Sequence, residues 1–132
     1  MTGLLLITHG NLGGDMLDTA KEILGGCPLP AEAIAVDADC DPDHLYKTAG
    51  KLCDKLDDGS GVLVLTDLYG STPSNVANRL IDMHNTRVVA GANLPMLLRI
   101  LNYPDMGLEA LCDKAANGAR DGIVVTTRKQ AS

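Results

Sequence analysis

Aromatic residues are scarce in this sequence, which has no phenylalanine, no tryptophan and only three tyrosines among its 132 residues. Its hydrophobic content of 45% therefore consists mainly of leucine, valine, isoleucine, alanine and methionine. Such an aliphatic composition favours helices packed on a buried sheet. A chain of this length buries about two-thirds of its unfolded surface without disulfide bonds. We therefore expect one domain over residues 1–132.

An excess of positive charge is also absent, because 11 lysines and arginines stand against 17 aspartates and glutamates, a formal net charge of −6. A nucleic-acid partner is disfavoured, since binding a phosphate backbone needs a basic face. No apolar run reaches the ~20 residues of a membrane helix. The run at residues 4–7 is too short for a signal peptide and follows no basic residue. The sequence thus predicts a cytoplasmic protein with no direct membrane insertion.

Close pairs of cysteines are missing as well. A zinc site usually contains such a pair, but the four cysteines lie at least 13 positions apart, at Cys27, Cys40, Cys53 and Cys112. We expect reduced, unpaired thiols, no metal site and no cofactor. His44 and His84 stand beside acidic residues in or after predicted helices, which favours solvated surface positions.

Five short apolar runs, by contrast, have the length of β-strands. They cover residues 4–7, 33–36, 62–65, 88–90 and 123–125. At least three of them are nearly continuous rather than alternating, which is typical of strands covered on both faces in a parallel sheet. Segments with helical spacing lie between the runs, at residues 12–24, 42–59, 72–81, 95–101 and 108–115. This alternation predicts an α/β fold, a doubly wound open sheet of mainly parallel strands in the order 2-1-3-4.

Ligands of open α/β sheets bind beyond the carboxyl ends of the strands, where the strand order reverses. In the order 2-1-3-4 that point lies between the first and third strands, which end at His9 and just before Asp67. A histidine acts as a nucleophile through one ring nitrogen when the other donates its proton to a fixed acceptor. Asp67 is placed to be that acceptor. We therefore predict His9 and Asp67 as the catalytic pair.

A predicted helix start lies at the same edge. Thr72 precedes Pro73, a residue that is favoured in the first turn of a helix. Free backbone N–H groups there, together with the hydroxyls of Ser71 and Thr72, would hold phosphoryl oxygens. Gly10, next to the histidine, completes the predicted phosphoryl-binding set.

Three motifs at successive strand ends resemble one protein family. They are residues 7–10 (ITHG), residues 66–73 (TDLYGSTP) with Asn75 following, and residues 91–97 (GANLPML). On these motifs the chain resembles the mannose-type enzyme IIA of the bacterial sugar phosphotransferase system, which is also called the mannose/fructose/sorbose family. The resemblance extends from residue 3 to about residue 128.

The resemblance implies a phosphotransferase with a phosphohistidine intermediate. His9 would accept a phosphoryl group from the phosphocarrier HPr and pass it to an enzyme IIB, as part of a sugar transport complex at the membrane. The resemblance likewise implies that Asp67 is the partner of the His9 ring and that Thr72 contacts the phosphoryl group.

Two departures from the family pattern limit this transfer. Ser71 and Thr72 stand where family members often show Gly-Ser before the proline, which alters the hydroxyl geometry. The chain stops at Ser132 without a fused IIB domain. We therefore expect IIB to be a separate chain or to be absent, in which case phosphorylation of His9 is a regulatory signal.

Three alternatives remain at this stage. A receiver-like signalling module would be phosphorylated on Asp67, although such modules place an acidic cluster after the first strand and this chain has His9 and Gly10 there. The phosphotransfer subunit of a dihydroxyacetone kinase would share the fold and the histidine. A small-ligand binding module without transfer chemistry comes last, because no residue specifies its ligand.

The last apolar run indicates an assembly. A fifth strand must join an edge of a four-stranded sheet, and an unpaired edge invites another chain. Gly118 and Gly122 would supply a hinge for exchange between protomers. The resemblance implies the same, since mannose-type IIA domains exchange a C-terminal strand. We expect a homodimer in which residues 122–128 pair with the sheet of the partner.

Overall fold

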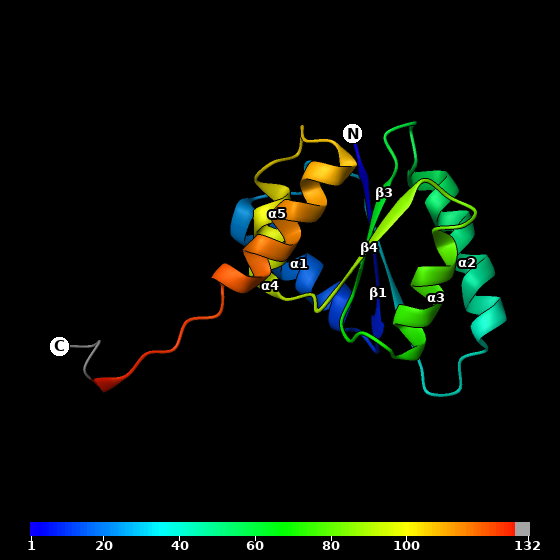
Figure 1. Cartoon of the computed structure of the whole chain (residues 1–132), viewed down its shortest axis with the longest axis horizontal. Helices are drawn as coiled ribbons and strands as arrows, with labels where there is room; N and C mark the ends of the chain where they lie inside the picture. Colours follow the sequence, from blue (N-terminus) through cyan, green and yellow to red (C-terminus); the bar gives the residue numbers. More distant parts are fainter. Residues whose placement is uncertain (129–132) are drawn as a thin grey trace.

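The computed structural model describes residues 1–128 and has a sheet of four strands between two layers of helices (Figure 1). Along the chain the elements are β1 (Gly3–His9), α1 (Leu12–Leu24), β2 (Ala31–Val36), α2 (Pro42–Leu56), β3 (Val62–Thr66), α3 (Thr72–Leu80), β4 (Thr86–Ala90), α4 (Leu94–Leu101) and α5 (Leu108–Asp121). The described sheet has the order β2-β1-β3-β4, and every pairing in it is parallel. The predicted fold class and strand order are confirmed.

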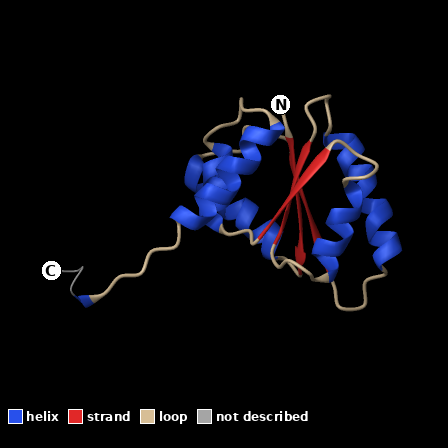
Figure 2. Cartoon of the chain, in the orientation of Figure 1, coloured by secondary structure: helices blue, strands red, loops and turns tan. Residues whose placement is uncertain are grey.

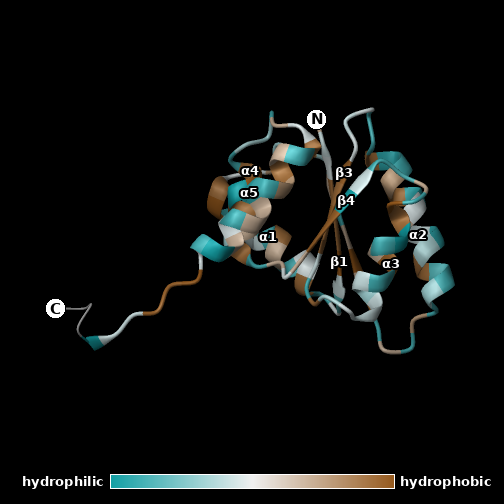
Figure 3. Ribbon diagram, in the orientation of Figure 1, coloured by the Kyte–Doolittle hydropathy of each residue, from teal (hydrophilic) through white to brown (hydrophobic). Residues whose placement is uncertain are grey.

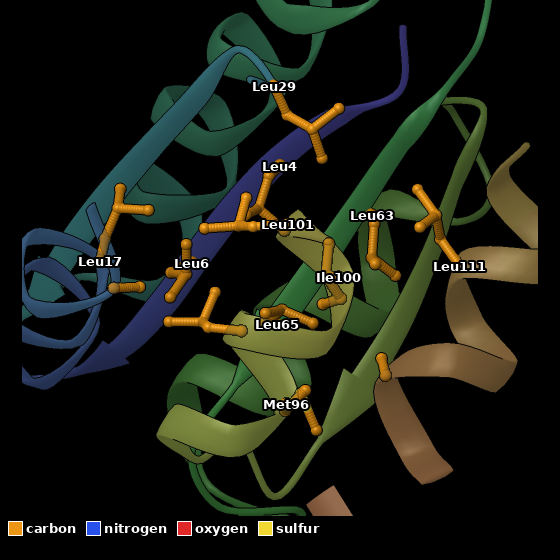
Figure 4. Packing of buried hydrophobic residues seen from close by; sticks show 13 residues of the cluster. Leu4, Leu6, Leu17, Leu29, Leu63, Leu65, Met96, Ile100, Leu101 and Leu111 are labelled. Carbon is orange, nitrogen blue, oxygen red and sulfur yellow. The ribbon is translucent and has the colours of Figure 1, made fainter. Parts of the chain in front are cut away.

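Helices cover both faces of this sheet, α1, α4 and α5 on one side and α2 and α3 on the other (Figure 2). Side chains alternate along a strand, so Leu4 and Leu6 of β1 enter one hydrophobic cluster while Leu5 and Ile7 enter the other. Figure 4 shows the first cluster, where leucines of β1 and β3 pack against α4. Each fully buried leucine contributes about 1.5–3 kcal/mol. The two-sided burial explains why the strands are continuously apolar.

Helix α2 ends three residues before the predicted end at residue 59. Its start is as expected, with Pro42 in the first turn and the Asp41 carboxylate accepting the Asp43 N–H at 3.1 Å. After Leu56 the chain turns, because Asp57 Oδ1 accepts the N–H groups of Gly59 and Gly61 at 2.8 and 2.9 Å. A side chain that bonds its own loop in this way competes with continued helix.

Helix α5 is longer than predicted, and this removes Gly118 from the proposed hinge. Gly118 lies inside the helix and Gly122 is its C-cap. A Cβ atom at Gly118 would lie 2.5 Å from Arg99 Cβ, and one at Gly122 would clash with Pro95. Both glycines therefore allow α5 to pack closely on α4. Gly118 therefore does not form the predicted hinge, whereas Gly122 marks the point where residues 123–128 leave the helix, and a hinge there stays a prediction.

Residues 123–128 leave the end of α5 and extend away from the body of the molecule (Figure 1). Ile123, Val124 and Val125 are 72–77% exposed and form an apolar stretch in Figure 3. In this single chain they are not a strand, and within residues 1–128 β4 pairs with β3 alone. The predicted exchange needs a second copy and stays a prediction.

Four further predictions concern single residues and membrane spans. All four cysteines are free thiols and His44 is exposed, as expected. His84 is not a solvated histidine: its side chain is 18% exposed, and Nδ1 lies 3.1 Å from Asp54 Oδ1. That prediction was wrong, because the ring packs against the bare backbone of Gly50 in α2. None of the helices within residues 1–128 has both the length and the hydropathy to cross a bilayer.

Candidate active site

The ends of β1 and β3 bring the two predicted catalytic residues together. These strands are neighbours with Ile7 opposite Thr66, so His9 and Asp67 emerge at one edge of the sheet. Asp67 Oδ2 lies 2.8 Å from His9 Nδ1 and accepts the backbone N–H of His9 at 3.2 Å. One carboxylate oxygen therefore holds both the ring and the backbone of the histidine.

The charge of Asp67 determines the state of the ring. Burial alone would raise the pKa of this carboxyl, but hydrogen bonds from the His9 ring, from the His9 N–H and from its own N–H lower the pKa below the ordinary value. An ionised carboxylate only accepts hydrogen bonds. Its partner Nδ1 must then carry the proton, which leaves the lone pair on Nε2.

The two side chains differ in access to solvent. His9 is 49% exposed, whereas Asp67 is 13% exposed. His9 lines an open groove of about 520 Å³, which is also lined by Gly10, Val36, Asp37, Ala38, Cys40, Thr72 and Pro73. The His9 side chain therefore borders the open space of the groove, while the Asp67 carboxylate is largely covered.

Gly10 shapes the wall of the groove beside His9. Its φ of 50° lies in the left-handed region, which a residue with a Cβ adopts only at a cost. Its N–H donates to Val36 O at 3.0 Å and ties the end of β1 to the end of β2. Gly10 lines the groove with its N–H already bonded, and its predicted contact with a phosphoryl group stays a prediction.

Helix α3 begins at the groove. Its first turn contains the N–H groups of Thr72 and Ser74, which have no acceptor within the helix, while Pro73 has no N–H. Thr72 is exposed and lines the groove. Such a helix start is a ready anion-binding site. The structure thus gathers His9, Gly10 and Thr72 around one space.

Ser71, the remaining predicted residue, is the N-cap of α3 and does not line the groove. Its hydroxyl donates to Leu68 O at 2.6 Å and makes no capping bond to the helix. The proton of Ser71 is therefore committed to the β3–α3 loop.

The groove also contains two residues that the sequence analysis missed as site residues. Asp37 and Cys40 belong to the loop after β2, and both line the same groove as Thr72. The available signal was the strand order itself, because β2 lies next to β1 and its carboxyl end falls at the same edge. Within residues 1–128 no group of three or more His, Cys, Asp or Glu side chains is arranged to hold a metal ion.

Comparison with known proteins identifies the family of this chain. The family model described as "PTS system fructose IIA component" matches residues 3–116. The chain belongs to the mannose-type enzyme IIA family of the phosphotransferase system. This confirms the resemblance drawn from the three motifs, and the chain is a IIA component of this type.

Two curated relatives are similar over most of this enzyme IIA chain. The mannose-specific EIIAB component of Escherichia coli (strain K12) is 31% identical over 123 residues, which are 91% of this chain and 38% of that protein. The putative phosphotransferase enzyme IIA component YadI from the same strain is 30% identical over 105 residues, or 76% of this chain and 69% of that protein. This chain thus spans little more than a third of the EIIAB relative.

Solved structures of IIA proteins have the same fold. The mannose/sorbose-specific IIA subunit from Enterococcus faecalis superposes with a TM-score of 0.85 at 24% identity, covering 96% of this chain and 95% of that one. The EIIA component from Streptococcus agalactiae superposes with a TM-score of 0.81 at 28% identity, covering 95% and 97% of the two chains.

Proposed function

We propose that this IIA component is a phosphocarrier in which His9 Nε2 accepts a phosphoryl group from phospho-HPr and passes it to an enzyme IIB. The observation that carries this proposal is the 2.8 Å contact between His9 Nδ1 and the ionised Asp67. It leaves Nε2 as the unprotonated ring nitrogen on a half-exposed side chain. The receiver-like alternative, with Asp67 as acceptor, is disfavoured by the burial of that carboxylate behind the ring.

The chemical step needs no added co-reactant. The Nε2 lone pair forms the bond to phosphorus while the bond from phosphorus to the donor breaks, and the donor leaves with that electron pair. The ring becomes positively charged with its proton still on Nδ1, and the nearby carboxylate stabilises this charge. Transfer to IIB runs the same exchange in reverse, with an acceptor atom of IIB as the nucleophile.

The start of α3 supplies the contacts to the phosphoryl oxygens. Thr72, which lines the groove in the first turn of α3, would offer its N–H and its hydroxyl to the developing negative charge at the positive end of the helix dipole. Gly10 contributes by adopting the left-handed conformation of the turn directly after His9. Ser71 acts through the loop that it bonds.

A labelling experiment tests the acceptor. Enzyme I, phosphoenolpyruvate and HPr are expected to label the parent chain and His44→Ala, a change at an exposed histidine, but not His9→Ala. The label is expected to be lost in acid and to survive base, as for a phosphohistidine. A label that survives acid and is removed by hydroxylamine would transfer the proposal to Asp67.

The second half of the proposal concerns the acceptor protein. Labelled chain is expected to lose its phosphoryl group to an enzyme IIB within the time in which it stays labelled alone. Transfer to a dihydroxyacetone kinase and to no IIB would favour that alternative. Retention of the label with both acceptors would favour a regulatory role. The cytoplasmic location of the protein stays an expectation.

The homodimer is part of the same proposal. The exposed residues Ile123 to Val125, the free outer edge of β4, and a groove of about 240 Å³ lined by Val89, Ala90 and Met96 support an exchange of the last residues. Sedimentation of the full chain at micromolar concentration is expected to show a dimer. A chain ending at Gly122, which keeps α5 whole, is expected to be monomeric, and a monomeric full chain would refute the exchange.

A further inference from the structure

Helix α1 starts directly behind the proposed nucleophile, and it starts without the usual local cap. His9 ends β1, Gly10 and Asn11 form the turn, and α1 begins at Leu12. Asn11 occupies the N-cap position, but its side chain makes no capping bond. The cap comes instead from the strand, because Thr8 Oγ1 accepts the Gly13 N–H at 2.8 Å.

This bond closes the turn that carries His9. Thr8 and Gly13 lie on either side of the turn, and both are buried. The turn is held on its other sides by Gly10 N–H to Val36 O at 3.0 Å and by His9 N–H to Asp67 Oδ2 at 3.2 Å. The Thr8 bond is the side-chain contact that ties the turn to α1.

The close approach of α1 to β1 is built into the sequence. A Cβ atom at Gly13 would lie 3.0 Å from Leu6 Cβ and 3.1 Å from Thr8 Oγ1, tighter than ordinary contact. At the neighbouring Gly14 a Cβ would meet nothing within 4 Å. Gly13 therefore lets its N–H reach the threonine, whereas Gly14 has no such role.

Other buried threonines show that Thr8 is not simply a filler of the core. The hydroxyls of Thr2, Thr66 and Thr86 are buried without a hydrogen-bond partner, whereas the hydroxyl of Thr8 is bonded. Valine has nearly the same shape as threonine but no hydroxyl. Replacement by valine thus removes a hydrogen bond at Thr8 and none at Thr86.

We propose that Thr8 is a positioning residue, which fixes the β1–α1 turn so that the His9 ring keeps Nδ1 on Asp67 and Nε2 toward the groove. The inference rests on the proposed function in that it assigns the residue a part in phosphoryl transfer. Small displacements of a reacting group cost large factors in rate, about 10²-fold for 1 Å. Partial loosening of the turn is expected to slow phosphoryl transfer about tenfold.

The test compares Thr8→Val with Thr8→Ser and with the control Thr86→Val. At saturating phospho-HPr, Thr8→Val is expected to transfer about tenfold more slowly, with the half-saturating donor concentration unchanged. Thr8→Ser, which keeps the acceptor oxygen, is expected to recover the rate, and Thr86→Val to match the parent. A folded Thr8→Val chain that transfers at the parent rate would overturn the inference.

Nuclear magnetic resonance of ¹⁵N-histidine gives a readout that needs no donor. The parent is expected to carry its His9 proton on Nδ1, and Thr8→Val to shift part of the population to the Nε2 tautomer. If the parent is not labelled on His9, the proposed function fails and this shift still decides the role of Thr8. A lower melting temperature with an unchanged tautomer would mean a structural role alone and would overturn the inference.

A second pair of variants covers the case that Thr8→Val does not fold. Gly13→Ala pushes α1 away from Thr8, and Gly14→Ala adds the same methyl group into open space. Gly13→Ala is expected to slow transfer and shift the tautomer in the direction of Thr8→Val, and Gly14→Ala to do neither. Equal behaviour of the two alanine variants would overturn the inference.

Discussion

The helices of residues 1–128 begin in two ways, with or without a side-chain cap from the N-cap residue, and the two helices that follow the strands carrying His9 and Asp67 are among those without one. Helices α2 and α4 begin with a side-chain cap from their own N-cap residue, since Asp41 accepts from Asp43 N–H and Asn93 from Met96 N–H. Helices α1 and α3, which follow the strands that carry His9 and Asp67, have no such cap. Caps stabilise a helix, but they also occupy the donors that would otherwise bind an anion.

The comparison separates stability from function. At α3 the first-turn N–H groups stay free for the proposed phosphoryl group, and at α1 one of them serves to hold the turn behind His9. Changes at the starts of α1 and α3 are therefore expected to affect transfer, and changes at the capped starts of α2 and α4 to affect folding. Variants of Asn93 and Ser71 test this division, and Asp67→Asn tests the pair that the uncapped starts surround.

The largest effect is expected for Asp67→Asn. An amide in place of the carboxylate no longer stabilises the charged ring and favours the wrong ring tautomer, so transfer to His9 is expected to slow by about 10²-fold or more. Stopped reactions with phospho-HPr measure this rate. Asp39→Asn, a loss of the same charge in the exposed loop before α2, is expected to change it little. An Asp67→Asn chain as fast as the parent would contradict the orienting role.

The next effect belongs to a capped start. Asn93→Ala removes the acceptor for Met96 N–H at 2.9 Å and the donor to Ala119 O at 3.2 Å, so it is expected to lower the free energy of unfolding by about 1–2 kcal/mol in a urea titration. Asn93→Asp keeps the acceptor oxygen and is expected to lower the free energy of unfolding by less. Transfer per folded molecule is expected to stay at the parent rate for both variants, and a slowed rate would break the division.

Ser71→Asp converts an uncapped start into a capped one. The Ser71 backbone is extended, as an N-cap requires, so an aspartate there is expected to cap α3, but it loses the Ser71 bond to Leu68 O, and the net change in stability is expected to stay within about 1 kcal/mol. Its charge would compete with the phosphoryl group and is expected to slow transfer about tenfold. Ser71→Asn, a neutral cap, serves as the control for charge. Faster transfer in Ser71→Asp would contradict the anion site.

The smallest effect is the pH dependence that Asp67 adds to stability. Its pKa is lowered in the folded chain, so its contribution is present above the unfolded pKa of about 3.9 and is lost as the pH falls through the folded value. The difference in unfolding free energy between the parent and Asp67→Asn is therefore expected to shrink below about pH 4. Urea titrations at pH 3 to 7 measure it, and a difference that grows toward low pH would contradict the lowered pKa.

Much of the fold followed from local patterns. The continuously apolar runs at β1 and β3 and the caps at Asp41 and Pro42 predicted elements that the structure contains. Helix α5 was cut short in the prediction because Gly118 is a poor helix former in isolation. Within the fold Gly118 is part of the helix because its lack of a side chain lets α5 pack against Arg99 of α4. That contact joins segments that are distant in the sequence.

The candidate site divides in the same manner. The position of His9 and Asp67 at neighbouring strand ends was visible once the strand order was predicted. The contribution of Asp37 and Cys40 to the groove required the loop after β2 to be placed beside β1. Sequence spacing also could not show that His84 is largely covered by α2.

By itself, the sequence determined the alternation of strands and helices, the family and the residue types at the edge of the sheet. Only the tertiary structure decided how each polar group is used: Ser71 bonds its own loop, Thr8 bonds α1, and the start of α3 receives no side-chain cap. The physical reason is range. Hydrophobic periodicity is a property of neighbouring residues, whereas a hydrogen bond depends on a separation of about 3 Å, which packing alone sets.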